Sequence, residues 1–446
     1  MTALLLFGIF FILVFLGLPI AISLGVSSIA VLLISGGITN LELVPDILFS
    51  SVSKFTLLAI PFFVLAGVIM DYAGISKRLI HFADVCVGHL KGGMILVTVI
   101  TAIFFAAISG SGPATVAAIG GILIPALAKN GVKRETGSAL VASSGAIGIV
   151  IPPSIAFIIF AVVAGDQASV SIGRLFVAGI FPGLLMGIAF VFAALYAKKR
   201  GLSSGVPGAN NEVAAAIEVR KRASGKEIWK AFLDAIGGLL IPVIILGGIY
   251  GGVFTPTEAA VVAVFYGFIV GIFIYRELKI ADVFKILYDA AVQTAIITFI
   301  VSTASLFAYI ITTESIAETM SDTLLGLSSN PIIILLILNI ILLIAGMFID
   351  AISAFYIFVP ILLPIILHFN MDPTVFGVIM TVNLAIGLFT PPVGLNLYVA
   401  SGIGNVKIQS ISKAIIPFVV AAVVVLLLIT YIPSLSTYLP DLMGIK

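Results

Sequence analysis

Two segments of the sequence place glycines and a pair of prolines inside long apolar runs. Residues 148–154 are Gly-Ile-Val-Ile-Pro-Pro-Ser and residues 387–394 are Gly-Leu-Phe-Thr-Pro-Pro-Val-Gly; we call them the first and second breaks. Proline lacks an N–H and disfavours helical angles in the preceding residue, so we expect a helix to be interrupted in each. Carbonyl oxygens freed in an apolar environment are costly unless they find partners. The pattern indicates cation coordination by these carbonyls, with the restarted helix directing its positive N-terminus at an anion. A kink satisfied by neighbouring helices is the alternative.

Two turns between apolar arms could complete such a site. The first tip, residues 109–113, is Ser-Gly-Ser-Gly-Pro between arms at about 94–108 and 115–129. Arms of this length cross only about half of a bilayer and its interface at about 1.5 Å per residue, and small residues let the tip approach an ion closely. The second tip, residues 346–353, contains Asp350 between long apolar runs. A carboxylate within a membrane suggests a function; the alternative is that Asp350 only caps the following helix.

The composition excludes most classes of soluble protein. Of the 446 residues, 61% are hydrophobic and only 9% are charged, whereas about 25% are charged in ordinary soluble domains. We therefore exclude soluble enzymes, nucleic-acid-binding proteins and disordered proteins. Cys86 is the single cysteine, and the sequence has neither a Gly-x-x-x-x-Gly-Lys-[Ser/Thr] nucleotide motif nor a His-Glu-x-x-His zinc motif. No histidine is expected at the depth of the first tip, which disfavours an intramembrane serine protease, so no enzymatic activity is expected.

The apolar runs predict an all-α polytopic membrane protein with about ten crossings and two re-entrant hairpins, 94–129 and 331–368. Residues 198–230 are polar and rich in Lys and Arg, and we interpret them as a cytoplasmic linker with an interfacial helix near Trp229. On this orientation the outer side keeps only three basic residues, Lys54, Arg174 and Lys446. Ordinary paired crossings in place of the hairpins would satisfy the charge pattern equally well.

An internal repeat relates the two halves of the chain. Residues 145–153 match 384–392, and the same offset carries Ile124-Pro125 onto Leu363-Pro364 and Gly165 onto Gly404. We expect residues 1–197 and 231–446 to be the two copies. Each copy would hold five crossings and one hairpin, and because five is odd the second copy would be inverted, as in many secondary transporters. The alternative is a duplicated membrane scaffold that does not transport.

Four motifs in combination resemble a known family. They are Ile-Ser-Gly-Ser-Gly-Pro-Ala-Thr at 108–115, the first break, Thr-Pro-Thr-Glu-Ala at 255–259, and Leu-Phe-Thr-Pro-Pro-Val-Gly-Leu-Asn at 388–396. Essentially the whole chain resembles the large membrane (DctM-type) subunit of tripartite ATP-independent periplasmic (TRAP) transporters. The resemblance implies sodium-driven import of an organic anion, typically a C4-dicarboxylate or a sialic acid, by an elevator movement of a transport domain against a scaffold.

The resemblance also implies partners and a location. The partners would be a small four-helix membrane subunit (DctQ-type) and a soluble periplasmic substrate-binding protein (DctP-type). The chain would lie in the bacterial inner membrane with both termini in the periplasm. No cofactor is implied beyond Na⁺ as the coupling ion.

The resemblance further implies particular site residues. The first sodium site would use Ser109 with the carbonyls of Gly148, Ile151 and Pro153. The second would use Gly346 with Gly387, Thr390 and Val393. Because no Lys or Arg lies beside either tip, a substrate carboxylate would be held by hydroxyls, amides and helix N-termini, for which the candidates are Thr115, Ser154, Ser353 and Asn396, with Asp350 as a candidate acid.

Two other functions remain alternatives. A one-component sodium/dicarboxylate symporter shares the hairpin architecture and needs no partner. A membrane scaffold or channel-like protein would bind ions without coupling their movement to a substrate.

Overall fold

The computed structural model describes residues 2–199 and 222–445, and every regular element in these ranges is helical. The first half contains α1 (Thr2–Phe15), α2 (Ile20–Gly36), α3 (Leu43–Val52), α4 (Ala59–Tyr72), α5 (Ile75–Val87), α6 (Gly93–Ser109), α7 (Gly112–Lys129), α8 (Arg134–Ala146), α9 (Ile155–Ala164) and α10 (Ile172–Lys199). The second contains α12 (Gly225–Tyr250), α13 (Pro256–Ile269), α14 (Val283–Thr313), α15 (Ile316–Leu327), α16 (Pro331–Gly346), α17 (Ala351–His368), α18 (Pro373–Gly387), α19 (Leu395–Gly404), α20 (Ile408–Ala414), α21 (Ile416–Tyr431) and α22 (Ser434–Leu442).

The helices are those of a polytopic membrane protein. By length and composition, eight described segments can cross a membrane, or up to nine when α20 and α21, bent by 49° at their junction, are counted as one span. The sequence predicted about ten crossings. The count is lower because turns and breaks leave several apolar helices, among them α9 and α18, shorter than a span.

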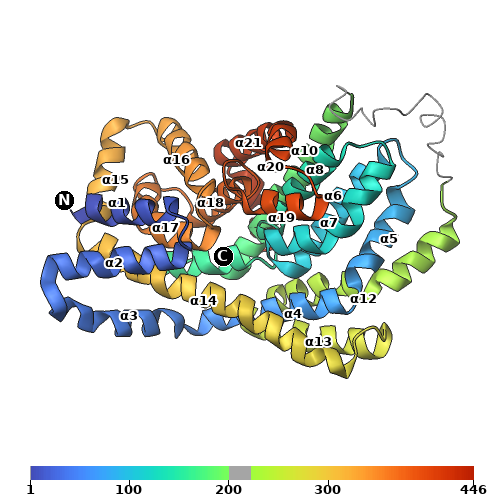
Figure 1. The fold of residues 1–446 in the computed structure, drawn as a ribbon, viewed down its shortest axis with the longest axis horizontal. Coiled ribbons are helices and arrows are strands. Elements are labelled where there is room, and N and C mark those ends of the chain that lie inside the picture. The colour runs from blue at the N-terminus through green and yellow to red at the C-terminus, as the bar shows by residue number, and fades with distance from the viewer. Residues whose placement is uncertain (1, 200–221, 446) are drawn as a thin grey trace.

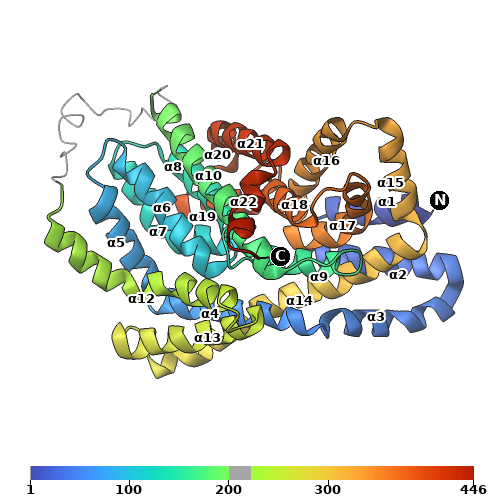
Figure 2. The same cartoon turned by 180° about the vertical axis from the view of Figure 1, so that it is seen from behind.

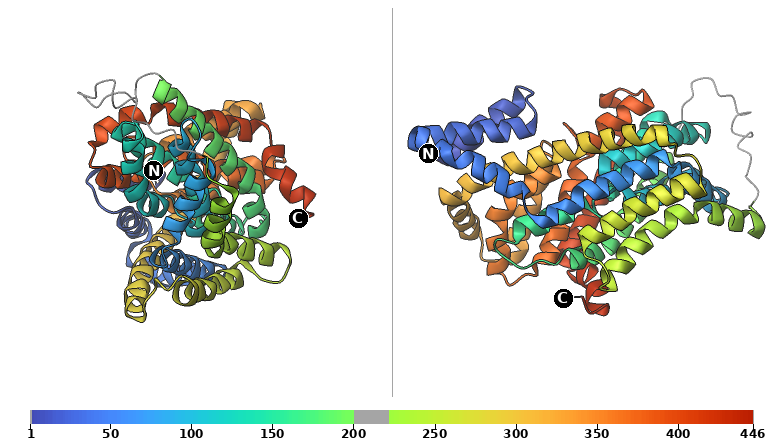
Figure 3. Two further views of the ribbon diagram at one scale, coloured as in Figure 1. Left: turned by 90° about the vertical axis from the view of Figure 1, so that its right-hand side faces the viewer. Right: turned by 90° about the horizontal axis from the view of Figure 1, so that it is seen from below.

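The helices form two packed layers (Figure 1). One layer contains α14, α4, α13 and α12, which lie side by side when the molecule is seen from below (Figure 3). The other layer contains both breaks and the helices that pack around them. The layers do not follow the chain halves, since α4 from the first half packs against both α13 and α14 from the second.

Two amphipathic helices connect these layers. The first, α5, follows Gly74, which has a left-handed φ of 69°, and leads to α6; the second, α15, follows Ser315, whose φ is 51°, and leads to α16. Figure 1 shows α5 and α15 at opposite ends of the molecule. Each half of the chain therefore turns sharply into a connecting helix just before its hairpin.

Both halves place a helical hairpin before an interrupted helix. In the first half α6 and α7 form the hairpin and α8 and α9 the interrupted helix, and in the second half these are α16–α17 and α18–α19. The second arm of each hairpin packs on the restarted helix of the other half, because α7 contacts α19 and α17 contacts α9 (Figures 1 and 2). The two halves are therefore interlocked at their breaks.

The arms of the first hairpin are longer than the sequence predicted, and those of the second have a similar length. Helices α6 and α7 have 17 and 18 residues, and α16 and α17 have 16 and 18. Such helices rise about 24–27 Å, close to the hydrocarbon thickness of about 30 Å. Arm length alone therefore no longer distinguishes a re-entrant hairpin from a pair of crossings.

Most of the predicted linker, residues 200–221, lies outside the described part. The helix that follows, α12, begins with a capping box in which the Ser224 N–H donates to Glu227 Oε2 at 2.7 Å. Trp229, predicted to lie on an interfacial helix, is in the first turns of α12 and stacks on Phe232 with ring centroids 5.5 Å apart. The helix continues without interruption to Tyr250.

Candidate ion and substrate site

The first break interrupts a helix as the prolines predicted. Helix α8 ends at Ala146, a short 3₁₀ turn follows, and α9 restarts at Ile155. Ser154 caps α9: its hydroxyl donates to the Ile149 carbonyl at 2.5 Å and accepts the Phe157 N–H at 3.4 Å. Among the described residues, no backbone N–H donates to the carbonyl oxygens of Ile151 and Pro153. Two of the predicted ligand carbonyls are thus left with free acceptor capacity.

The first tip lies directly against the first break. A Cβ placed on Gly110 would be 2.8 Å from the Pro153 carbonyl oxygen. A Cβ on Gly148 would be 2.8 Å from both the Ser111 carbonyl oxygen and Thr115 Oγ1. Since real Cβ atoms do not approach so closely, only glycine fits at these two contacts, and the backbones of tip and break meet there.

The first tip and break gather oxygen atoms in a buried site without charged side chains. Ser109 Oγ lies 2.9 Å from Thr115 Oγ1, and the Thr115 hydroxyl donates to the Ser111 carbonyl at 2.8 Å. Ser109 is 7% exposed and Thr115 is fully buried. Hydroxyl and carbonyl oxygens are the ligands that hard cations prefer, so this donor set fits a small alkali cation better than a transition metal.

The second break makes an even closer contact with its own hairpin. Helix α18 ends at Gly387, and a Cβ on Gly387 would be 2.3 Å from the Gly346 carbonyl oxygen. Within the described chain, the carbonyls of Gly346 and Val393 receive no backbone N–H. The buried Thr390 hydroxyl donates to the Ile386 carbonyl at 2.6 Å, which leaves its oxygen lone pairs available. Three of the four predicted ligands therefore retain acceptor capacity.

Asp350 at the second tip caps the helix that follows. Its Oδ1 accepts the N–H groups of Ile352 and Ser353 at 2.9 and 3.0 Å, and its Oδ2 accepts the Ser353 hydroxyl at 2.6 Å. A carboxylate at a helix N-terminus is also stabilised by the helix dipole. This geometry favours the capping role that the sequence left as an alternative.

The variant Asp350→Asn separates capping from ion binding. The side-chain oxygen of asparagine can still accept both backbone N–H groups, and the substitution removes the negative charge. We expect a loss of about 1–2 kcal/mol of stability, the size of a charge–dipole effect at a partly buried helix end, and an unchanged sodium dependence of uptake. Thermal unfolding measures the change in stability, and titration of uptake with sodium measures the sodium dependence. A large loss of sodium affinity in a normally folded Asp350→Asn protein would instead make Asp350 an ion ligand.

The predicted substrate residues are buried and occupy different contacts. Thr115 belongs to the first tip, Ser154 caps α9, and Ser353 donates to Asp350. The Asn396 Nδ2 donates to the Ala142 carbonyl in α8 at 2.9 Å. The hydroxyl donors of Thr115, Ser154 and Ser353 are therefore engaged within the protein, whereas Asn396 uses one of its two amide hydrogens, so a substrate anion must displace a bond to use the hydroxyls.

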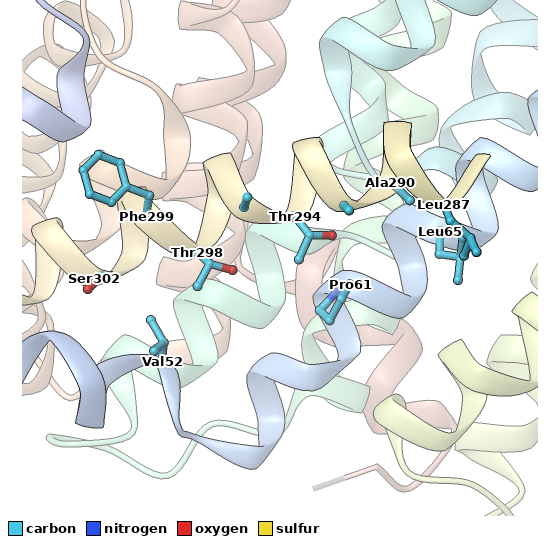
Figure 4. A pocket seen from close by; sticks show the side chains of 11 residues that line it. Val52, Pro61, Leu65, Leu287, Ala290, Thr294, Thr298, Phe299 and Ser302 are labelled. Atoms are coloured by element: carbon cyan, nitrogen blue, oxygen red, sulfur yellow. The ribbon is translucent and has the colours of Figure 1, made fainter. Parts of the chain in front are cut away.

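An apolar groove lies apart from the breaks, along α14 (Figure 4). It has a volume of about 630 Å³ and is lined by 11 residues from α3, α4 and α14, none of them charged. Figure 4 shows Thr294 and Thr298 on the side of α14 that faces Val52 and Pro61. Its lining is apolar apart from the hydroxyls of Thr294, Thr298 and Ser302, and it contains none of the predicted ion or substrate residues.

The sequence predictions missed a buried network of hydrogen-bonded polar side chains near the second break. Asn383 in α18 donates to Asn339 Oδ1 at 2.7 Å, and Asn339 in α16 donates to the Thr430 hydroxyl in α21 at 3.0 Å. All three are at most 2% exposed. Amides inside apolar helices were the available signal, because polar groups within a membrane segment require partners. This hydrogen-bond network connects three helices of the layer that holds both breaks.

Comparison with known proteins identifies the family. The model for the tripartite ATP-independent periplasmic transporter, DctM component, matches residues 7–435. The chain is 45% identical to the isethionate TRAP transporter permease protein DctMQ of Oleidesulfovibrio alaskensis over 97% of its own length and 65% of that protein's. It is 37% identical to the C4-dicarboxylate TRAP transporter large permease protein DctM of Rhodobacter capsulatus over the full length of both, and 33% identical to the sialic acid TRAP transporter permease protein SiaT of Haemophilus influenzae over 98% of this chain and 68% of that protein.

Solved structures show the same fold at low sequence identity. The YdaH transporter of Alcanivorax borkumensis superposes with a TM-score of 0.62 at 14% identity, over 88% of each chain. MtrF of Neisseria gonorrhoeae superposes with a TM-score of 0.59 at 14% identity, over 90% of this chain and 85% of the MtrF chain. The family match confirms the resemblance of the motifs, and it is to a transporter permease rather than an enzyme. The chain belongs to the DctM family, the large multi-pass permease component of bacterial inner-membrane TRAP transporters.

Proposed function

We propose that this chain is the large permease subunit of a sodium-coupled transporter that imports an organic anion. The observation that carries the proposal is the close contact of each hairpin with an interrupted helix whose carbonyls are free, in a chain of the TRAP permease family. The relatives are named for C4-dicarboxylates, sialic acid and isethionate, which share an anionic head group. A C4-dicarboxylate, a sialic acid or a similar carboxylate is the proposed substrate class, and the isethionate relative extends it to sulfonates.

The two contacts are the proposed sodium sites. Ser109 with the carbonyls of Gly148, Ile151 and Pro153 forms the first, and the second consists of Gly346, Gly387, Thr390 and Val393. Neutral oxygens suit a weakly held ion that must be released on the other side of the membrane. The anion would then sit near the N-termini of α9 and α19, with hydroxyls such as Thr115, Ser154 and Ser353 reorganised around it.

Transport would occur by an elevator movement of one layer against the other. The layer that holds both breaks would be the moving body, and the layer of α4, α12, α13 and α14 the scaffold. Helices α5 and α15 connect the two and would act as the arms. The cross-packing of α7 on α19 and α17 on α9 supports a pair of inverted repeats, 1–197 and 231–446.

The proposed hairpins, 94–129 and 331–368, would be re-entrant, with tips near the membrane midplane. We expect the labelling of a cysteine introduced at Ser111, in a Cys86→Ser background, to depend on sodium or substrate, because a midplane tip is exposed to each side only in one state of the transport cycle. Labelling with an impermeant reagent on right-side-out and inside-out vesicles measures this. Free labelling from both sides without ligand dependence would contradict re-entrance.

The permease would work with a small DctQ-type membrane subunit and a periplasmic DctP-type binding protein that delivers the anion. The fused name of the Oleidesulfovibrio relative supports the small subunit. Both termini would face the periplasm and residues 198–230 the cytoplasm.

Reconstitution tests the proposed function. Proteoliposomes carrying the permease, the small subunit and the binding protein should take up substrate when an inward sodium gradient is imposed and should not do so in potassium. Omitting the binding protein should abolish uptake. Sodium-driven uptake by the permease alone would instead support the one-component symporter, and ion flux without substrate would support a channel-like protein.

A further inference from the structure

Asn396 closes the loop of the second break. Its backbone N–H donates to the Leu388 carbonyl at 2.8 Å, and α19 begins one residue earlier, at Leu395. The closed loop contains Thr390 and Val393. The position of Asn396 is therefore fixed by the same backbone that forms the proposed second sodium site.

The side chain of Asn396 reaches the first half of the chain. Its Nδ2 donates to the Ala142 carbonyl in α8, the helix that runs into the first break, across 254 residues of sequence. It also lies on the first tip, since a Cβ on Gly112 would be 3.2 Å from Asn396 Oδ1 and 3.3 Å from Nδ2. One side chain thus touches the first tip and the helix that leads into the first break, while its own backbone belongs to the second break.

The amide is held there although its oxygen has no partner. Asn396 is fully buried, and Oδ1 accepts no hydrogen bond within the described chain. Burying an unpartnered amide oxygen costs free energy that an apolar side chain of similar size would avoid. One of the two Nδ2 hydrogens is donated to the Ala142 carbonyl, and the unpartnered oxygen is an acceptor, which repels a carboxylate. Packing alone therefore does not explain why an amide stands at this position.

We propose that Asn396 couples the two sodium regions, so that an ion bound in one raises the affinity of the other. This inference rests on the proposed function. A sodium ion in the second break would order the loop that holds Asn396, and the amide would transmit that order to the first tip through Gly112 and to the first break through Ala142. By linkage the effect is reciprocal, and an ion in the first region equally favours the ordered second loop.

Thermal unfolding of the purified full-length chain in sodium and in potassium, at constant ionic strength, tests the coupling without substrate or partner proteins. Ligands that bind only the folded state raise the unfolding temperature according to their concentration and affinity. For the wild type we expect a sodium-specific rise of the unfolding temperature, and equilibrium binding of radioactive sodium to the same protein should give a Hill coefficient above 1 that approaches 2 for strongly coupled sites. In Asn396→Ala the coefficient should fall to about 1 and the apparent sodium affinity should weaken by about 5- to 150-fold.

Asn383→Ala is the matched control. Asn383 is another fully buried asparagine with an unpartnered Oδ1, in the helix that leads into the same break, but its hydrogen bonds go to Asn339 and the Ile379 carbonyl, both in the second half. This variant should lose stability in sodium and potassium alike and keep the wild-type Hill coefficient. An equal loss of cooperativity in Asn383→Ala would overturn the proposal, because the loss would then follow from removing any buried amide and not from the contact of Asn396 with the first half.

A second variant approaches the contact from the other side. A Cβ on Gly112 would be 2.9 Å from the Leu388 Cδ1 atom, the flexible end of a side chain that can move, and would press on the Asn396 amide. Gly112→Ala should therefore fold and also lower the Hill coefficient, even if Asn396→Ala fails to fold. Unchanged cooperativity in the folded variants would overturn the coupling role, whereas a wild type with no sodium-specific stabilisation would contradict the proposed function itself.

Discussion

Replacing Gly387 with alanine is expected to lower the apparent sodium affinity of transport on the order of 100-fold. The new Cβ would be 2.3 Å from the Gly346 carbonyl oxygen and 2.6 Å from the Gly346 Cα, and backbone atoms cannot rotate away. Overpacking of this kind costs about 3 kcal/mol at the upper end of its usual range, which corresponds to on the order of 100-fold in affinity. Substrate uptake against sodium concentration in the complete reconstituted system measures it.

Gly402→Ala is the control for this variant. Gly402 lies in α19, the helix that restarts after the same break, and a Cβ there would meet nothing within 4 Å. It should transport as the wild type does, or be slightly more stable, because alanine favours a helix over glycine. If Gly387→Ala transported with unchanged sodium half-saturation, the contact with Gly346 would have no part in ion binding.

Thr390→Val should weaken apparent sodium affinity by about 10- to 150-fold. Valine keeps the shape of the side chain and removes the hydroxyl oxygen, which would otherwise face the ion while its proton goes to Ile386. One interaction with a charged group contributes about 1.5–3 kcal/mol, and every 1.4 kcal/mol is tenfold in affinity. Substrate affinity should fall as well, since linked ligands affect one another reciprocally, and high sodium should partly restore uptake.

Thr381→Val controls for the loss of a buried hydroxyl. Thr381 is fully buried in α18 and donates to the Gly377 carbonyl at 2.7 Å, four residues back, with the same local geometry as Thr390. Its replacement should leave sodium dependence unchanged. Equal sodium curves for Thr381→Val and Thr390→Val would remove Thr390 from the site. If Ser109→Ala also left sodium dependence unchanged, both sites would rest on backbone carbonyls alone.

The sequence predicts the breaks well because their cause is local. A proline pair denies two donors to the preceding turn wherever the fold places it, so the ends of α8 and α18 follow from sequence alone. The contact of the first tip with the first break was also predictable in outline. Glycines at 110 and 148 indicate close backbone approach, and the internal repeat directs attention to both segments.

Contacts between distant parts of the chain could not be predicted from the sequence. The bond from Asn396 to Ala142 depends on how α19 packs on α7 and α8, which no local pattern specifies. Asp350 shows a second limit, because an acid between apolar runs suits a cap and an ion ligand equally until its hydrogen bonds are known. The arm lengths differ for a third reason: glycines and serines at the hairpin ends continue the helices further than hydropathy alone indicates.

The most direct test of the account is an experimental structure of the permease determined in sodium and again in potassium. The account predicts ion density in sodium, absent in potassium, at two places. One is enclosed by Ser109 and the carbonyls of the first break, and the other by Gly346, Thr390 and the carbonyls of the second. Well-resolved maps that show no ion density at either break, in sodium or in potassium, would contradict the claim that the interrupted helices bind the coupling ion.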